Sequence, residues 1–199
     1  MDGRARCDAA MIGDGFDEVL EAAAGGDERS FAVLWRDLQP GLLRYLRVVA
    51  SAAAEDLASE TWLDVVRGLA RFEGGELGFR AWVFTVARHR VTDWRRRTAR
   101  QPSIPVPAEL LPQQAAPDDP AKQAMEAIST EAALALISQL PPDQAEVVAL
   151  RSVAGLDVAR VAEILGKRPG AVRVLAHRGL RRLADRLAAE QRLGGGVTR

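Results

Sequence analysis

The sequence predicts an all-α protein of two small helical domains, an N-terminal helical bundle and a C-terminal helix-turn-helix bundle, joined by a proline-rich linker. Apolar residues recur at intervals of three and four in both halves, and no alternating pattern long enough for a strand is present. Residues 101–120 contain six of the ten prolines and no basic residue, a composition that interrupts helices. All ten aromatic residues lie at or before Trp94, so the two halves also differ in composition.

These breaks divide the chain into five predicted segments. A structureless stretch of about 20 residues is uncommon inside one compact domain, which favours two domains over one. The segments are an acidic arm with the first helix (1–27), a helical domain (28–100), the linker (101–120), a helix-turn-helix domain (121–193) and a short tail (194–199).

Periodicity in the N-terminal half predicts about four helices, at 16–24, 30–50, 55–70 and 79–97. Gly25 and Gly26 separate the first two of them. Gly74, Gly75 and Gly78 indicate a loop before the fourth. The fourth helix has an apolar face and an opposite face with many arginines, which is typical of a helix that packs on one side and binds a partner on the other.

The C-terminal half is predicted to contain helices at 121–139, 144–153, 158–165 and 169–187. Asp157 is a favourable N-cap for the third of these, and Gly166 is a favourable stop for it. Pro169 stands where proline commonly begins a helix. Two helices separated by a short glycine-containing turn form a helix-turn-helix signature.

The last helix has two faces of different character. Arg173 lies on the polar face, where Val174 also lies. Arginine can bond guanine in the major groove, and an apolar residue such as Val174 can contact a thymine methyl group. The alternative is an ordinary amphipathic helix whose arginines are only solvated. The predicted packing arc consists of Val172, Ala176, Gly179, Leu180, Leu183 and Leu187.

The net charge is zero, with 27 basic and 27 acidic residues, but the charges are segregated. Residues 80–100 hold seven arginines and one acid, and residues 160–192 hold nine basic residues and three acids. Residues 1–29 hold eight acids and three arginines. Two basic patches on a neutral chain favour two local contacts with nucleic acid over general adhesion. Solvated helix faces are the alternative.

Composition argues against several other classes of protein. No apolar run approaches the roughly 20 residues of a membrane span, and the start of the chain lacks an apolar signal core, so we expect a cytoplasmic protein without membrane insertion. The single cysteine excludes an internal disulfide framework, and with only two distant histidines we expect no metal site. No phosphate-binding loop, nucleophile elbow or paired histidine is present, so we expect neither enzyme activity nor a cofactor.

Three segments together resemble the extracytoplasmic-function (ECF) sigma factors of RNA polymerase. AAEDLASETW at 53–62 resembles the stretch with which sigma factors bind the polymerase. FRAWVFTVARHRVTDWRRR at 79–97 resembles their promoter-melting segment. LDVARVAEILGKRPGAVRVLAHRGLRRL at 156–183 is similar to their helix-turn-helix. The order and spacing of the three segments make the resemblance specific.

The resemblance implies a division of labour along the chain. The clamp of the largest polymerase subunit would be bound by Asp56, Leu57, Glu60 and Trp62. The −10 promoter element would be bound by Arg80, Arg88, His89, Arg90, Trp94, Arg95, Arg96 and Arg97, with an unstacked base held in the 72–78 loop. The −35 element would be bound by Arg168, Gly170, Arg173, Val174, His177, Arg178 and Arg181. An anti-sigma factor is a further partner that the resemblance suggests.

Some positions depart from the family pattern. Val174 and Leu175 replace residues that are usually polar in the recognition helix, and Ser59 replaces a usual glutamine. Two other functions remain open from the residues alone. One is an independent helix-turn-helix transcriptional regulator with a helical sensor domain, and the other is a helical adaptor whose basic faces bind acidic proteins.

Overall fold

The computed structural model of the protein describes residues 12–100 and 130–194. Every regular element in these ranges is helical, which confirms the predicted all-α class. The N-terminal half contains α1 (Phe16–Ala24), α2 (Glu28–Ala50), α3 (Ala54–Leu69) and α4 (Glu76–Arg100), with single 3-10 turns at Gly13–Gly15 and Ser51–Ala53. The C-terminal half contains a helix at 130–138, then α6 (Pro142–Val148), which continues as a π-helical turn at Ala149–Val153, α7 (Val158–Leu165) and α8 (Pro169–Gly194). The predicted linker and the first part of the helix predicted at 121–139 lie outside the described residues.

The fourth helix begins earlier than the sequence predicts. α4 starts at Glu76, so the loop after α3 comprises only residues 70–75, and Gly78 lies inside the helix. The carboxylate of Glu76 accepts hydrogen bonds from the backbone amides of Ile12 (2.7 Å) and Gly13 (3.0 Å). An acid in the first turn also suits the positive end of the helix dipole. Glu76 therefore supports this extra turn and ties Ile12 and Gly13 to it.

α2, α3 and α4 form the core of the N-terminal half, and α1 packs against α2. Gly68 of α3 allows the close approach of α4, because a Cβ atom there would lie 2.7 Å from a ring carbon of Trp82. The ring of Phe72 stacks on Trp82 with centroids 5.2 Å apart and meets Phe79 edge-on at 5.4 Å. Phe72, within the short loop, therefore helps to pack the bundle.

In the C-terminal half, α8 packs against α6 and α7. Val172 of α8 is fully buried. Gly179 permits the contact with α6, since a Cβ atom there would lie 2.8 Å from a methyl group of Val148. A small residue at this crossing is therefore a requirement of packing.

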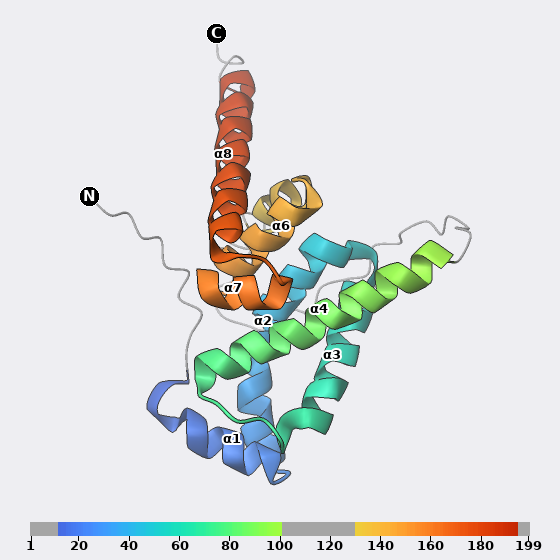
Figure 1. Cartoon of the computed structure of the whole chain (residues 1–199), viewed down its shortest axis with the longest axis vertical. Coiled ribbons are helices and arrows are strands. Elements are labelled where there is room, and N and C mark those ends of the chain that lie inside the picture. The colour runs from blue at the N-terminus through green and yellow to red at the C-terminus, as the bar shows by residue number, and fades with distance from the viewer. Residues whose placement is uncertain (1–11, 101–129, 195–199) are drawn as a thin grey trace.

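The two halves contact each other, which the sequence does not predict. α2 packs against α6 and the π-helical turn, α4 packs against α7, and the buried residues form one continuous cluster. Figure 1 shows the C-terminal helices seated beside α2 and α4, while α8 extends away from the rest of the molecule. The described residues therefore form one body with two helical parts.

A buried polar group lies at this contact. Glu146 of α6 accepts hydrogen bonds from the hydroxyl of Tyr45 in α2 (3.3 Å) and from Nε of Arg88 in α4 (3.1 Å). The Tyr45 ring is fully buried and meets Phe84 edge-on, with centroids 5.5 Å apart. Burial, followed by the negative charge of Glu146, raises the pKa of Tyr45 well above its usual value. Glu146 therefore joins three helices from both halves.

Candidate nucleic-acid interface

The turn between α7 and α8 has the local structure that its sequence predicts. Asp157 caps α7, its side chain accepting a hydrogen bond from the amide of Arg160 at 2.8 Å. Gly166 ends α7 in the left-handed region, with φ of 61°, where glycine carries no steric penalty. Pro169 is the first residue of α8. These three positions set the angle at which α8 leaves α7.

The seven residues predicted to contact the −35 element all lie on the exposed surface around the start of α8. Arg173 and Arg181 form no side-chain hydrogen bond or ion pair with other described residues, and the same holds for His177. Arg182 and Arg186 on the same helix instead donate to Gln144 and Gln139, at 3.0 and 2.9 Å. The fold thus separates Arg182 and Arg186, which donate to glutamines of the C-terminal half, from a set of exposed side chains without such a partner. That set is Arg168, just before α8, and Arg173, His177, Arg178 and Arg181 within it.

The packing arc of α8 is narrower than predicted. Val172 and Gly179 are buried, and Ala176 and Leu183 are partly buried, but Leu180 and Leu187 are 52% and 45% exposed. Leu180 and Leu187 therefore lie at the edges of the apolar arc, where α8 is only partly covered.

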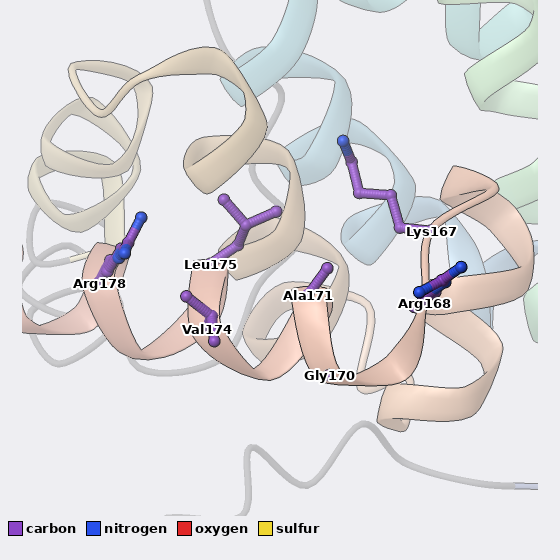
Figure 2. A pocket seen from close by; sticks show the side chains of 7 residues that line it. All are labelled: Lys167, Arg168, Gly170, Ala171, Val174, Leu175 and Arg178. Atoms are coloured by element: carbon purple, nitrogen blue, oxygen red, sulfur yellow. The ribbon is translucent and has the colours of Figure 1, made fainter.

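A shallow groove lies at the start of α8 (Figure 2). Ala171, Val174 and Leu175 provide its apolar surface, and basic side chains stand at both ends. Val174 is 48% exposed. The full lining is Lys167, Arg168, Gly170, Ala171, Val174, Leu175 and Arg178. Helical spacing predicts Val174 on this face, but it does not predict the groove around it.

The predicted −10 residues on α4 do not form one free surface. Arg80, which the sequence predicts to bind the −10 element, is instead buried: only 4% of it is exposed, and its Nη2 lies 2.9 Å from a carboxylate oxygen of Asp37. This ion pair holds α4 to α2. Burial raises the pKa of Asp37, and the charge of Arg80 opposes that shift. Arg80 is therefore not available to a DNA phosphate in this structure.

Arg90 and Arg97 of α4 are engaged with acids of α3. Arg90 donates from Nε to Asp64 at 2.6 Å and lies 3.5 Å from Glu60, and Arg97 lies 3.7 Å from the same Glu60 oxygen. The hydrogen bond to Asp64 raises the pKa of Arg90. The predicted polymerase-binding acid Glu60 thus contacts two of the predicted DNA-binding arginines.

The other predicted residues of α4 have varied surroundings. Arg88 is bound to Glu146, and Arg95 donates to the carbonyl oxygen of Val49 at 2.8 Å. Arg96 forms only an exposed pair with Asp93 at 3.7 Å. His89 is exposed, whereas Trp94 is partly buried and packs against the core.

The surface of α3 differs from the prediction in its apolar members. Leu57 and Trp62 are 1% and 7% exposed, and Trp62 donates from its indole nitrogen to Gln39 at 2.6 Å, so both belong to the core. Leu63 and Val66 are 57% and 53% exposed. They lie seven and ten residues after Asp56, which places all three residues on the same face of the helix. This spacing is the sequence signal that could have identified Leu63 and Val66. The outer face of α3 is therefore acidic at its start and apolar at its end.

Among the residues that the structure describes, no group of three potential metal ligands is found. None of the described helices is both long enough and apolar enough to cross a membrane.

Two family models match the chain, one in each half. The model for Sigma-70 region 2 matches residues 34–101, and the model for Sigma-70, region 4 matches residues 130–183.

Curated relatives cover most of the chain. It is 33% identical over 186 residues to the ECF RNA polymerase sigma factor SigD of Mycobacterium tuberculosis, covering 90% of this chain and 87% of that protein. It is 37% identical over 186 residues to the ECF RNA polymerase sigma factor ShbA of Streptomyces griseus, covering 87% and 94%. The similar BldN of Streptomyces coelicolor is 33% identical over 177 residues, covering 88% and 67%.

Two solved structures share the fold. CnrH, in complex with the cytosolic domain of CnrY, matches with a TM-score of 0.60 and 20% identity over 88% of this chain and 99% of that one. The sigma factor RpoE, in complex with the anti-sigma factor NepR from Bartonella quintana, matches with a TM-score of 0.59 and 21% identity over 80% and 98%.

Proposed function

Because this chain belongs to the ECF RNA polymerase sigma factors, we propose that its helices divide the work of promoter recognition among three surfaces. The chain is a sigma factor that binds core RNA polymerase and directs it to promoters. In the proposed division, α8 binds the −35 element, α4 binds the −10 element and assists DNA opening, and α3 binds the clamp of the largest polymerase subunit. The proposed boundaries of the two functional domains are 28–100 and 121–193.

The observation that carries the proposal is the set of unpaired cations on α8. No acidic partner is found among the described residues for Arg168, Arg173, Arg178 or Arg181. Arg182 and Arg186 instead donate hydrogen bonds to glutamines. Free guanidinium groups on one helix face suit both phosphates and guanine edges. This face is therefore the proposed −35 reader.

The proposed −10 surface lies along the second half of α4. His89, Arg95 and Arg96 are exposed there. Arg90 and Arg97 are paired with Glu60 and Asp64, so each would exchange a carboxylate for a phosphate on binding DNA. Arg88 donates to Glu146 from Nε, so its Nη groups are the ones left for a phosphate. The proposal assigns Arg80 to the stability of the fold.

The proposed polymerase surface is the outer face of α3. Asp56 and Glu60 supply acids that suit a basic partner, which favours specificity and fast association. Leu63 and Val66 supply exposed apolar area beside them. Leu57 and Trp62 would act from beneath, by holding the helix against α2.

An anti-sigma factor is a further proposed partner. The support is that two proteins of the same fold, CnrH and RpoE, have been solved with the cytosolic domain of CnrY and with the anti-sigma factor NepR. A protein that co-purifies with this chain from its native host should lower its transcription in vitro. A co-purifying protein without that effect would not be its inhibitor.

Sigma factors are in general non-catalytic initiation factors. The proposed function accordingly includes no enzyme activity and no cofactor, and it places the protein in the cytoplasm with the polymerase. No helix suitable for membrane insertion is found in the described ranges.

Run-off transcription with purified core polymerase on fragments of the native genome tests the proposal. Adding the chain should produce new start sites, and the chain should co-elute with polymerase. The double variant Leu63→Asp with Val66→Asp should lose co-elution, while Val33→Asp, at an exposed position on α2, serves as its control. An independent regulator would instead bind DNA without polymerase and produce no new start sites.

A further inference from the structure

The groove at the start of α8 combines an apolar floor with basic ends (Figure 2). Ala171, Val174 and Leu175 lie between Arg178 at one end and Arg168 with Lys167 at the other. Val174 is 48% exposed, so its methyl groups are accessible to a partner. An apolar floor offers no hydrogen bond, so it favours a partner group that needs none.

The spacing of the basic ends fits duplex DNA. Arg168 and Arg178 are ten residues apart, which corresponds to about 15 Å along a helix axis. The major groove of DNA is about 12 Å wide. The two side chains can thus reach phosphates on both sides while the floor between them faces the edges of the bases.

The unpaired charges at the ends of the groove also favour DNA as its partner. Neither Arg168 nor Arg178 forms an ion pair with any other described residue. Lys167 lies 3.1 Å from Asp143, the acid at the start of α6, and is therefore partly neutralised. The remaining excess of positive charge at both ends of the groove favours a nucleic acid over an apolar protein segment.

The major groove presents one apolar group that suits this floor. Thymine carries a C5 methyl group there, whereas the other distinguishing groups are hydrogen-bond donors and acceptors. Donors and acceptors pressed against Val174 would lose water without gaining a bond. Gly170, which has no side chain, leaves room for a base edge beside the floor.

We propose that Ala171 and Val174 bind the C5 methyl group of a thymine in the −35 element, and that Val174 sets specificity at that base pair. The inference rests on the proposed role of α8 and adds the identity of the base and the chemical group that is read. It also accounts for an apolar residue at position 174 within an otherwise cationic face.

The test uses the full chain assembled with core polymerase. A promoter library with a randomised −35 element is transcribed, and the active templates are sequenced. Each thymine in the selected element is then replaced singly by deoxyuridine, which lacks only the C5 methyl group. Transcription is measured for the wild type, for Val174→Ala and for Leu180→Ala. Leu180 is a matched control, since it is an exposed apolar residue of the same helix outside the groove.

At one thymine, we expect deoxyuridine to reduce wild-type transcription about fourfold, the order expected for burying one methyl-sized group. Val174→Ala should transcribe both templates at nearly the same rate, close to the wild-type rate on deoxyuridine. Leu180→Ala should retain the wild-type ratio. If Val174→Ala transcribes the deoxyuridine template as fast as the wild type does, the variant is also shown to be folded.

Equal transcription of thymine and deoxyuridine templates at every position would overturn the inference, and so would selected elements without thymine. The same result is expected if the groove receives a protein side chain instead of DNA. Failure of the proposed function is distinct, because then no template would be transcribed and the chain would not bind polymerase, and both proposals would fall.

Discussion

Tyr45 is the only tyrosine in the chain, and it lies at the contact between the two halves. Its ring is fully buried, and its hydroxyl donates to Glu146. Burial and the adjacent carboxylate both disfavour the phenolate, so the pKa of Tyr45 is raised well above its usual value. A single buried tyrosine makes the closed arrangement visible to an optical titration.

We predict that the native protein shows no tyrosinate absorbance as the pH rises through about 10, the usual pKa of tyrosine. Because the pKa of Tyr45 is higher in the folded state, its contribution to stability is complete below pH of about 10 and is lost as the pH rises further. Ultraviolet absorbance during alkaline titration measures this. Tyr45→Phe is the control for the absorbance change, and ionisation near pH 10 in the native protein would show that Tyr45 is exposed.

Arg173 and Arg182 lie on one helix but face different surroundings. Arg173 is free, whereas Arg182 donates to Gln144 within the fold. Arg173→Ala should weaken binding of the holoenzyme to the −35 element by about 1–3 kcal/mol if Arg173 contacts a base. Electrophoretic mobility shifts on cognate and scrambled elements measure the change. Arg182→Ala should leave DNA affinity unaltered, and equal affinities of wild type and Arg173→Ala would remove Arg173 from the interface.

At the level of the single helix, two of the glycines in α8 have opposite roles. A Cβ atom at Gly179 would lie 2.8 Å from a methyl group of Val148, whereas one at Gly170 would meet nothing within 4 Å. Val148 is β-branched and only 2% exposed, so it has little freedom to move. The two positions therefore separate the effect of packing from the effect of helix propensity.

Gly179→Ala should lower the free energy of unfolding by about 1 kcal/mol, because overpacking of roughly 1–3 kcal/mol outweighs a gain in helix propensity of up to about 1 kcal/mol. Gly170→Ala should leave it unchanged or raise it by up to about 1 kcal/mol. Urea denaturation of the two variants beside the wild type provides the comparison. A Gly179→Ala variant as stable as Gly170→Ala would mean that α6 and α8 cross less closely than described.

Glu60 links α3 to α4 through ion pairs. This carboxylate lies within 4 Å of Arg90 and Arg97, at 3.5 and 3.7 Å, and it also belongs to the surface proposed to bind polymerase. Surface ion pairs of this kind each contribute little to stability. Replacing these ion pairs with contacts to polymerase and DNA therefore costs little free energy, which suits two adjacent binding surfaces.

At the scale of the whole molecule, the contact between the halves covers part of a proposed DNA surface. Arg88 donates its Nε hydrogen to Glu146, so in the closed arrangement only its Nη groups remain for a phosphate. Glu146 is only 9% exposed and serves Tyr45 as well. Its carboxylate therefore links the closed arrangement to one of the proposed −10 residues.

Glu146→Ala should weaken the contact between the halves by about 1–3 kcal/mol, since it leaves the buried hydroxyl of Tyr45 and the partly buried guanidinium of Arg88 without their acceptor. We expect a larger radius of gyration in small-angle X-ray scattering. Asp143→Asn removes an exposed carboxylate in the same helix and is the control. Identical scattering of Glu146→Ala and wild type would show that apolar packing alone closes the molecule.

The amino-acid sequence was sufficient to predict most of the helices, the N-cap and C-terminal stop of α7, and the exposed face of α8. Asp157, Gly166 and Pro169 act on their own neighbours in the chain, so their effect is legible without the fold. Helical periodicity likewise placed Arg173 and Val174 on the face opposite Val172, because that relation depends only on residue spacing.

Which charged and apolar residues are free to bind a partner depends on how the helices pack together. Arg80 and Arg96 are the same residue type on the same helix, yet one is buried against Asp37 and the other is exposed. Leu57 and Leu63 on α3 differ in the same way, with 1% and 57% exposure. Pairing and burial depend on neighbours far apart in sequence. The joining of Glu146 to Tyr45 and Arg88, from three separate helices, could for that reason be known only from the fold.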